Sequence, residues 1–555
     1  MRRPGQGMPC PYIQGTIVEQ YLIFNDLSYP IISVLLLLPL IGALLALLFK
    51  SDRALLLWGF AVTLVTALAS LPLYTQFDAS TAQYQFVELR TWLPALGLDY
   101  VVGVDGISML LVMLTTFVMP LCVLCSWSYI KERMKEFIFV LLVIETAMIG
   151  VFVSLNTLLF FLFWEAMLIP MYLMIAIWGG PRKDYASIKY FLYTFAGSIF
   201  FLASIIALYV HTGTFFIPEL MGQPYSFTFQ AWIFLGCTLA FAVKVPMFPL
   251  HTWLPAAHVE APTAGSVILA SIMLKLGGYG FLRFCLPMAP EATYYFMPWL
   301  LALSLISIVV GGYLALGQTD IKKLIAYSSV GHMGFVTLGI FLLNDQGIKG
   351  AMLQMINHGI TTGALFILIG IIYERTHSRE ISVNSALGAM MPIFVLFLGI
   401  FSLSSFGFPG TNSFVSEFLV LLAAFSKYPL VGALAVVGAI LAAAYMLRLL
   451  QRMVWADSDG HGHHAEDSQE GQEGGHHVLR DLNLREIGTL SFLTIFVFWI
   501  GFYPAPLLDV MDASVAHLLQ QMEAGVGEET LHVMSGLGDK LGELFSSSAP
   551  PAANF

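Results

Sequence analysis

Residues 231–253 read AWIFLGCTLAFAVKVPMFPLHTW, an apolar run that contains one charged residue, Lys244. A helix needs about 20 apolar residues to cross a hydrocarbon core of about 30 Å, so this run is long enough to span a membrane. Pro246 and Pro249 interrupt it, because proline lacks the backbone N–H that an inner helical turn requires. The segment is therefore predicted to be a transmembrane helix broken near its middle, with Lys244 close to the end of the first half.

Comparable apolar runs recur almost from residue 31 to residue 506. Its 555 residues are 58% hydrophobic and 11% charged, with a mean hydropathy of +0.80, which is typical of a membrane protein. Dividing the runs at polar residues predicts an all-α integral membrane protein of about fourteen transmembrane helices. The predicted spans are 31–49, 55–75, 107–129, 137–154, 157–178, 190–210, 231–253, 262–284, 295–316, 322–343, 350–373, 388–427, 430–450 and 486–506.

The twelfth span, 388–427, is too long for one straight crossing of the membrane. It contains Phe408-Pro409-Gly410, so a second broken helix is predicted there. Two broken helices five spans apart fit a transporter built from repeated helix bundles. The predicted parts are a polar or interfacial N-terminal extension (1–30), three helices (31–129), two five-helix bundles (130–285 and 286–455), a His- and Glu-rich loop (456–480), a last helix (481–506) and a tail (507–555).

The positive charges favour one orientation in the membrane. Sixteen of the 25 Lys and Arg residues lie in or beside loops that follow odd-numbered spans, and seven lie on the other side. Because cytoplasmic loops are enriched in Lys and Arg, we expect a multi-pass protein of the bacterial inner membrane with both termini periplasmic. The segment 457–477 is then cytoplasmic, and its Gly-, His-, Glu- and Gln-rich composition favours a solvated loop over a metal site.

Cofactor binding is not indicated by the sequence. Cys122 and Cys125 form a Cys-x-x-Cys pair inside or at the end of an apolar helix, but no second clustered pair completes an iron–sulfur site. Neither a strand-associated Gly-x-Gly-x-x-Gly nor a Gly-x-x-x-x-Gly-Lys-Ser/Thr motif occurs. We therefore expect no cofactor, no metal and no nucleic-acid partner, and a lipid bilayer as the main surroundings.

Ionisable residues inside the predicted spans are the strongest functional signal. Each costs about 2.5–3.5 kcal/mol near the bilayer centre on insertion scales, so it calls for a partner or a function. A buried charge can simply join helices, and for Glu145 this alternative is as good as proton transfer, while His332 and His358 fit either structural hydrogen bonding or a relay. The candidate proton-transfer residues are Glu145, Glu165, Lys244, Lys275, Glu417, His332 and His358.

The two predicted breaks place opposite charges at opposite helix ends. Lys244 precedes the first break, near the negative C-terminal end of a half-helix, which favours a cation. Glu417 follows Pro409 by about two turns, near the positive N-terminal end of the next half-helix, which favours an anion. His251 and His258 lie in the first break and just after it, where lining the break and proton transfer are equally good interpretations.

These motifs are similar to those of a known family. FAVKVP at 241–246, PLHTWLP at 249–255 and EAPTAGS at 260–266 closely resemble the signature of the antiporter-like subunits of respiratory complex I. The resemblance extends over roughly residues 95–450. Further matching segments are Leu274-Lys275, QTDIKKLIAYSS at 318–329, GHMGF at 331–335 and Asn357-His358-Gly359.

Within that family the chain resembles the M-type subunit of NADH:quinone oxidoreductase. Glu417 stands in FVSEF, residues 414–418, where sister subunits typically carry lysine. FWE at 163–165 and IPMY at 169–172 also look like the M-type fifth span. The 49 residues after the last span, 507–555, are too few for the long lateral helix of the L-type chain.

The resemblance implies a role for each candidate residue. Glu165 would pair with Lys244 and modulate its proton affinity, Lys275 would be the central relay, and Glu417 the terminal exchange group. His332 and His358 match histidines on the same polar axis, and Glu145 matches a carboxylate that only some members carry. The implied function is proton translocation coupled to quinone reduction in partner subunits, with sister antiporter-like subunits on both sides.

The sequence leaves three alternative functions. A multisubunit sodium/proton antiporter would use the same buried charges, and a homologous membrane hydrogenase or ferredoxin-linked complex would differ chiefly in its partners. A structural membrane scaffold is disfavoured by the concentration of charges within the spans.

Overall fold

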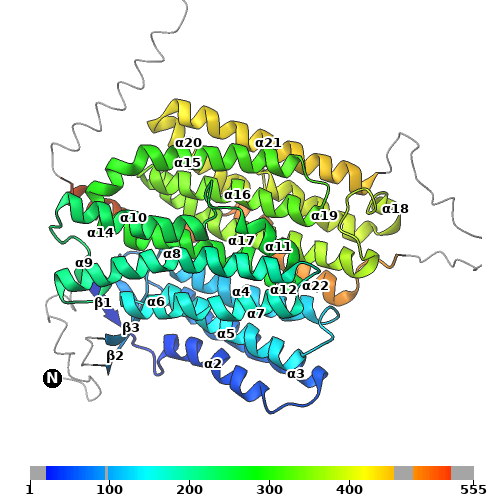
Figure 1. Cartoon of the computed structure of the whole chain (residues 1–555), viewed down its shortest axis with the longest axis horizontal. Coiled ribbons are helices and arrows are strands. Elements are labelled where there is room, and N and C mark those ends of the chain that lie inside the picture. Colours follow the sequence, from blue (N-terminus) through cyan, green and yellow to red (C-terminus); the bar gives the residue numbers. More distant parts are fainter. Residues whose placement is uncertain (1–20, 94–97, 456–478, 527–555) are drawn as a thin grey trace, which may run out of the picture.

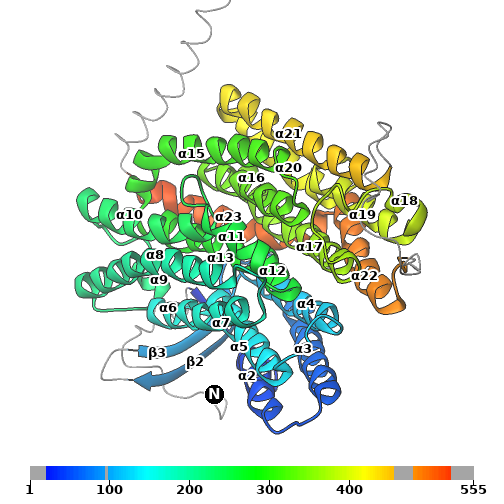
Figure 2. The same ribbon diagram turned by 45° about the vertical axis from the view of Figure 1, so that its right-hand side comes forward.

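Long helices lie side by side in one body, with α2 (Ile31–Ala46) and α3 (Asp52–Thr75) at one edge and α20 (Asn412–Lys427) and α21 (Pro429–Val454) at the opposite edge (Figure 1, Figure 2). The computed structural model describes residues 21–93, 98–455 and 479–526. The predicted loop at 456–480, apart from its last two residues, lies outside that range, as do most of the N-terminal extension and the end of the tail.

The elements of the first half follow one another as short and long helices. Two short π-helical segments, η2 and η3, interrupt the predicted eighth span. The bounds are α4 (Met109–Ser126), α5 (Met134–Val153), α6 (Thr157–Ala166), α7 (Leu168–Trp178), α8 (Lys183–Thr212), α9 (Ile217–Leu220), α10 (Phe227–Lys244), α11 (Trp253–Glu260), α12 (Thr263–Ile268), η2 (Leu269–Met273), α13 (Leu274–Gly280), η3 (Phe281–Cys285) and α14 (Leu286–Met288).

The second half contains the longest helix. This helix, α17, packs against α12, α16 and α20, and it is buried from Gly347 to Ile372 with few gaps, so its polar residues face other helices. The bounds are α15 (Pro290–Leu316), α16 (Ile321–Phe341), α17 (Asp345–Thr376), α18 (Leu387–Met390), α19 (Pro392–Ser405), α22 (Leu484–Phe502) and α23 (Ala505–Ala524).

The membrane class predicted from the sequence is confirmed. Within the described residues, 12 helices are long and apolar enough to cross a membrane, and Ile31–Ala46 and Pro392–Ser405 are shorter apolar helices. The count of fourteen stays a prediction, because the first predicted span is a helix of 16 residues and the twelfth is divided between α19 and α20.

Both predicted breaks are present. Helix α10 ends at Lys244, and α11 begins at Trp253 after the two prolines. Helix α19 ends at Ser405, and α20 begins at Asn412 after Phe408-Pro409-Gly410. The sequence did not predict η2 and η3, because a π-bulge adds one residue to a turn without needing a proline or glycine there.

A small sheet caps one end of the helices and was not predicted. β1 (Leu22–Phe24) pairs in parallel with β2 (Tyr84–Leu93), which pairs antiparallel with β3 (Leu98–Val104). Buried Arg283 holds this end to the bundle, since its Nη1 donates to the Tyr84 hydroxyl at 2.7 Å and its Nη2 to Asp105 Oδ1 at 2.7 Å. β1 lies in the predicted polar extension, so the end of that extension is structured.

The predicted tail begins with an amphipathic helix, α23, which crosses between the two halves (Figure 2). It buries Leu507, Val510, Met511, Ser514, Val515, Leu518 and Met522, at the spacing of one helical face. Ser514 Oγ accepts from Gly106 N at 3.0 Å, and Asp512 Oδ1 contacts Lys349 Nζ of α17 at 2.6 Å. α23 thus joins the sheet end of the first half to α17.

Candidate functional site

Lys275 and His358 are in direct contact in the centre of the body. Lys275 lies on α13, between the two π-helical segments, and is fully buried. Its Nζ contacts His358 Nδ1 on α17 at 2.7 Å and also donates to the carbonyl oxygen of Ala270. A π-bulge turns the residues after it relative to a regular helix, and this geometry aims Lys275 toward α17.

His332 continues the contact from His358 to Glu417. The His332 and His358 ring centroids lie 5.7 Å apart, and His332 Nδ1 is 3.0 Å from Glu417 Oε1. His332 Nε2 lies 3.4 Å from both the Ser405 hydroxyl and the Tyr445 hydroxyl.

Four predicted residues from four different helices thus form one buried series: Lys275, His358, His332 and Glu417. We call it the relay string. Each of its side chains can accept and release a proton, so the string offers a row of neighbouring proton-binding groups.

Polar side chains surround Glu417 more densely than the sequence suggested. Gln354 Nε2 on α17 donates to Glu417 Oε1 at 3.0 Å. Asn357 Nδ2 donates to the carbonyl oxygen of Asn412 at 2.7 Å and to Ser416 Oγ at 2.9 Å, which fixes the start of α20 against α17. Gln354 lies one turn before His358 on the same helix, so helical spacing alone could have identified it.

The first break is arranged differently. Lys244 is the last residue of α10, and its Nζ lies 5.3 Å from the Trp164 ring centroid and 5.6 Å from that of Tyr190. Within the described part of the chain, Lys244 forms no ion pair within 4.0 Å, and Glu165 Oε1 has no hydrogen-bond partner. The predicted Glu165–Lys244 pair is therefore open here: the two charges interact electrostatically without contact, and aromatic faces lie beside the ammonium.

Comparisons with known proteins assign the family. Residues 154–442 match the family described as "NADH:quinone oxidoreductase/Mrp antiporter, TM", and residues 34–151 match "NADH-ubiquinone oxidoreductase chain 4, amino terminus". NADH-quinone oxidoreductase subunit M of Rhodobacter capsulatus is 45% identical, over 84% of this chain and 91% of its own length. The chain belongs to the subunit M (chain 4) family of NADH-quinone oxidoreductases.

Other relatives agree with this subunit M membership. NADH-ubiquinone oxidoreductase chain 4 of Arabidopsis thaliana is 44% identical, over 88% of this chain and 97% of its own. A chain of respiratory complex I from Thermus thermophilus, solved with bound NADH, superposes with a TM-score of 0.79 at 29% identity, covering 89% of this chain and 100% of that one. The predicted M-type membership and the predicted membrane fold are both confirmed.

The subunit M chain also holds buried groups that the relay string does not include. Both carboxylate oxygens of Glu145, which is fully buried on α5, lack a hydrogen-bond partner among the described residues. Both ring nitrogens of His258 lack one as well, and its ring stacks on Phe366 with centroids 4.6 Å apart. Neither residue is in direct contact with the string, so the geometry gives each of them a weaker claim to proton transfer.

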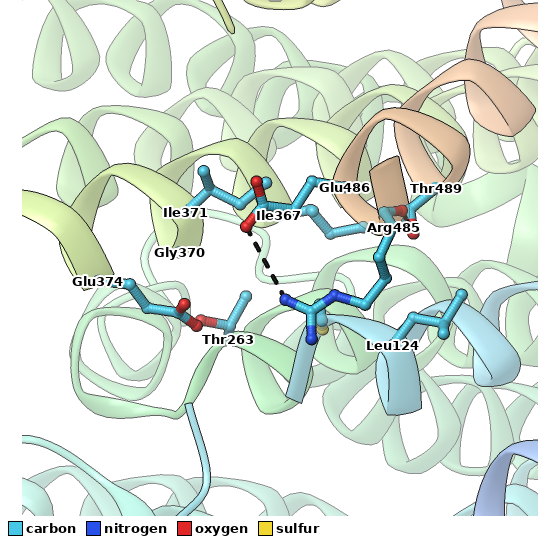
Figure 3. Close-up of a pocket in the computed structure, with 10 residues that line it drawn as sticks. Leu124, Thr263, Ile367, Gly370, Ile371, Glu374, Arg485, Glu486 and Thr489 are labelled. Carbon is cyan, nitrogen blue, oxygen red and sulfur yellow. Dashed lines mark hydrogen bonds and ion pairs between the residues drawn. The ribbon is translucent and has the colours of Figure 1, made fainter. Parts of the chain in front are cut away.

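A further polar cluster lies where α17 and α22 meet, away from the string. Arg485 and Glu486, on α22, and Glu374, on α17, line a cavity of about 10 Å³, and Figure 3 shows the three side chains around it. Arg485 Nη2 lies 3.8 Å from Glu486 Oε1, and Arg375 Nη2 donates to Glu486 Oε2 at 2.7 Å. The cavity is at the lower limit for one water molecule, so in this subunit M chain the cluster mainly joins helix ends.

Proposed function

We propose that this chain translocates protons across the membrane along the relay string, coupled to quinone reduction in partner subunits of NADH:quinone oxidoreductase. The observation that carries the proposal is the buried series in which Lys275 contacts His358, the His358 and His332 rings lie 5.7 Å apart, and His332 contacts Glu417. Burial of several titratable groups in a membrane bundle is costly, and a relay accounts for their alignment.

The first break would act as the control point of the string. An ammonium held only by aromatic faces keeps its proton less firmly than one beside a carboxylate, because the nearby anion stabilises the charged form. Movement of Glu165 toward Lys244 would therefore load a proton, and movement away would release it toward Lys275. The open pair in this structure would be the arrangement in which Lys244 releases its proton.

The energy for this transfer would come from outside the chain. Moving one proton against 100 mV costs about 2.3 kcal/mol. We assign that supply to the partner subunits that reduce quinone, and we propose sister antiporter-like subunits on both sides. The uneven distribution of Lys and Arg supports periplasmic termini in a bacterial inner membrane.

A sodium/proton antiporter is the second candidate, since the matched family description includes Mrp antiporters. Identity of 45% to a subunit M of NADH-quinone oxidoreductase favours the oxidoreductase. Sodium uptake by vesicles that contain the assembled complex, measured without NADH or quinone, separates the two functions.

The test of the relay string is Glu417→Gln in the assembled complex. The amide keeps the volume of the carboxyl group but cannot carry the proton, so NADH-driven proton pumping in inverted vesicles should fall on the order of tenfold or more. Native gels report assembly in the same membranes. Normal pumping in an assembled Glu417→Gln complex would remove Glu417 from the pathway.

Glu486→Gln is the matched control. Glu486 is also a buried carboxylate, but it pairs with Arg375 and caps α22. Its substitution should reduce the amount of assembled complex while leaving the protons pumped per NADH unchanged. An equal loss of that ratio in both variants would mean that any buried carboxylate is required, and it would contradict the proposal.

A further inference from the structure

Glu417 presents its two carboxylate oxygens to different surroundings. Oε1 receives two contacts, from His332 Nδ1 at 3.0 Å and from Gln354 Nε2 at 3.0 Å. Oε2 lies toward the second break: a Cβ built on Gly407 would come within 2.9 Å of it. One oxygen therefore faces the relay string and the other faces the interruption between α19 and α20.

Ser416 and Asn357 hold the Gln354 side chain with its NH₂ group toward Glu417. Gln354 Oε1 accepts from the Ser416 hydroxyl at 2.5 Å, and Ser416 Oγ in turn accepts from Asn357 Nδ2 at 2.9 Å. Because the carbonyl end of the amide is occupied as an acceptor, the NH₂ end is the one directed at Glu417. Gln354 is 1% exposed, so water does not replace these partners freely.

Gly407 is the residue of the break that faces the other oxygen. Its φ is +71°, a conformation that favours glycine, and a side chain there would collide with Oε2. The glycine thus lets the backbone of the break lie close to Oε2.

We propose that Gln354 is a positioning residue that fixes the route of a proton through Glu417, with one side of the route at Oε1 and the other on the side of Gly407. The inference rests on the proposed function of the relay string. It adds a residue that does not itself carry the proton.

The steps follow from donor and acceptor chemistry. His332 in its doubly protonated form gives its Nδ1 proton to Glu417 Oε1, so one N–H bond breaks, one O–H bond forms, and the ring is left neutral. The Gln354 N–H donor still points at this position, and the unprotonated oxygen of the carboxyl group is a better acceptor for it than the O–H oxygen. The carboxyl group therefore turns, placing its O–H toward Gly407 and its other oxygen toward Gln354. Loss of the proton to water on that side restores the carboxylate.

Gln354→Met tests this positioning role, because methionine has a similar length and no hydrogen-bonding amide. Loss of one donor to the ionised carboxylate weakens the ionised form relative to the protonated one. The acid limb of the pH profile of proton pumping should move upward by about one pH unit. Pumping near neutral pH should fall roughly fivefold, with assembly on native gels retained.

Gln230→Met is the matched control, since it makes the same substitution at another buried glutamine. Gln230 is 3% exposed, and it bonds to the Tyr225 carbonyl oxygen and to Glu291, both of which lie outside the relay string. This variant should leave the pH profile in place. If both variants shift the profile equally, general loss of packing explains the effect and the positioning role is contradicted.

Ser416→Ala provides a second measurement that does not depend on Gln354→Met assembling. It removes the hydroxyl that orients the Gln354 amide and that also accepts from Asn357, and it leaves the Gln354 side chain in place, so a shift in the same direction and of smaller size is expected. An unchanged profile in assembled Gln354→Met, or in Ser416→Ala where Gln354→Met does not assemble, overturns the inference. Glu417→Gln run in parallel distinguishes the two proposals: its failure to reduce pumping contradicts the relay string itself.

Discussion

The two broken helices hold their charges in contrasting ways. At the first break, Lys244 ends α10 and lies over the rings of Trp164 and Tyr190, with no ion pair in the described part of the chain. At the second, Glu417 lies in the second turn of α20 and contacts both His332 and Gln354 at 3.0 Å. The helix dipole favours the charge in each case, positive at a C-terminal end and negative near an N-terminal end.

The contrast separates two properties that a proton pathway needs. A charge with few fixed partners changes its proton affinity when a neighbour moves, so the Lys244 region suits control. A carboxylate that contacts two fixed partners presents its oxygens to defined neighbours, so the Glu417 region suits transfer along a fixed route. Substitutions of Lys244 and Glu165 test whether this difference is functional.

Lys244→Arg should have the largest effect. Arginine keeps the positive charge and can stack on Trp164 and Tyr190, but it stays protonated at any accessible pH. If Lys244 must release its proton, NADH-driven pumping should fall on the order of a hundredfold while the complex still assembles. Pumping by inverted vesicles and assembly on native gels are the measurements.

Lys323→Arg is a suitable control, since Lys323 lies at the partly exposed start of α16 and outside the relay string. It should pump as the unchanged chain does. A fully coupled Lys244→Arg complex would show that the first break needs only a cation, and the functional contrast between the breaks would disappear.

Glu165 substitutions should have an intermediate effect that depends on charge. Glu165→Gln removes the carboxylate whose approach would stabilise the charged lysine, so coupled turnover should fall about tenfold. Glu165→Asp keeps the charge on a stem one methylene shorter and should retain more activity than Glu165→Gln. NADH:quinone turnover with and without an uncoupler measures both, and equal activities of the two variants would mean that charge at this position is not used.

The sequence predicted the breaks well because their causes are local. Prolines after Lys244 and before Glu417 stop helical hydrogen bonding whatever packs around them. The sequence also predicted the burial of Lys275 and His358, because the few polar residues of a long apolar run lie inside the membrane with it. Their mutual contact at 2.7 Å required the fold, because α13 and α17 are distant in sequence.

The missed features depend on packing between distant segments. β1 pairs with β2 across about 60 residues, and the sheet is held by Arg283 through Tyr84 and Asp105. The open geometry of Glu165 and Lys244 could not be read from a motif either, because residue types do not fix side-chain separation. Helix α23 was missed although the sequence indicates it: the apolar residues from Leu507 to Met522 recur at the spacing of one helical face.

Substitutions in helix α23 should have the smallest effects, and they test whether the two halves of the chain, each with one break, are mechanically joined. Ser514→Ala removes the buried hydrogen bond from Gly106 N, which contributes about 1 kcal/mol. Asp512→Asn weakens the contact with Lys349, but Asp512 has a side-chain exposure of 53%, and Asp345 still pairs with Lys349 at 2.7 Å. A partly exposed ion pair contributes roughly 0.2–1 kcal/mol, so its loss should be the milder change.

Hydrogen exchange of the α23 amides in the assembled complex measures both changes. Ser514→Ala should speed exchange roughly fivefold, and Asp512→Asn by about twofold, because exchange through local opening follows the lost free energy. Pumping should stay near its original value in both variants, since neither residue touches the relay string. A large loss of pumping in Ser514→Ala would mean that α23 transmits motion between the two breaks, and that the first and second halves do not act as independent units joined only by the string.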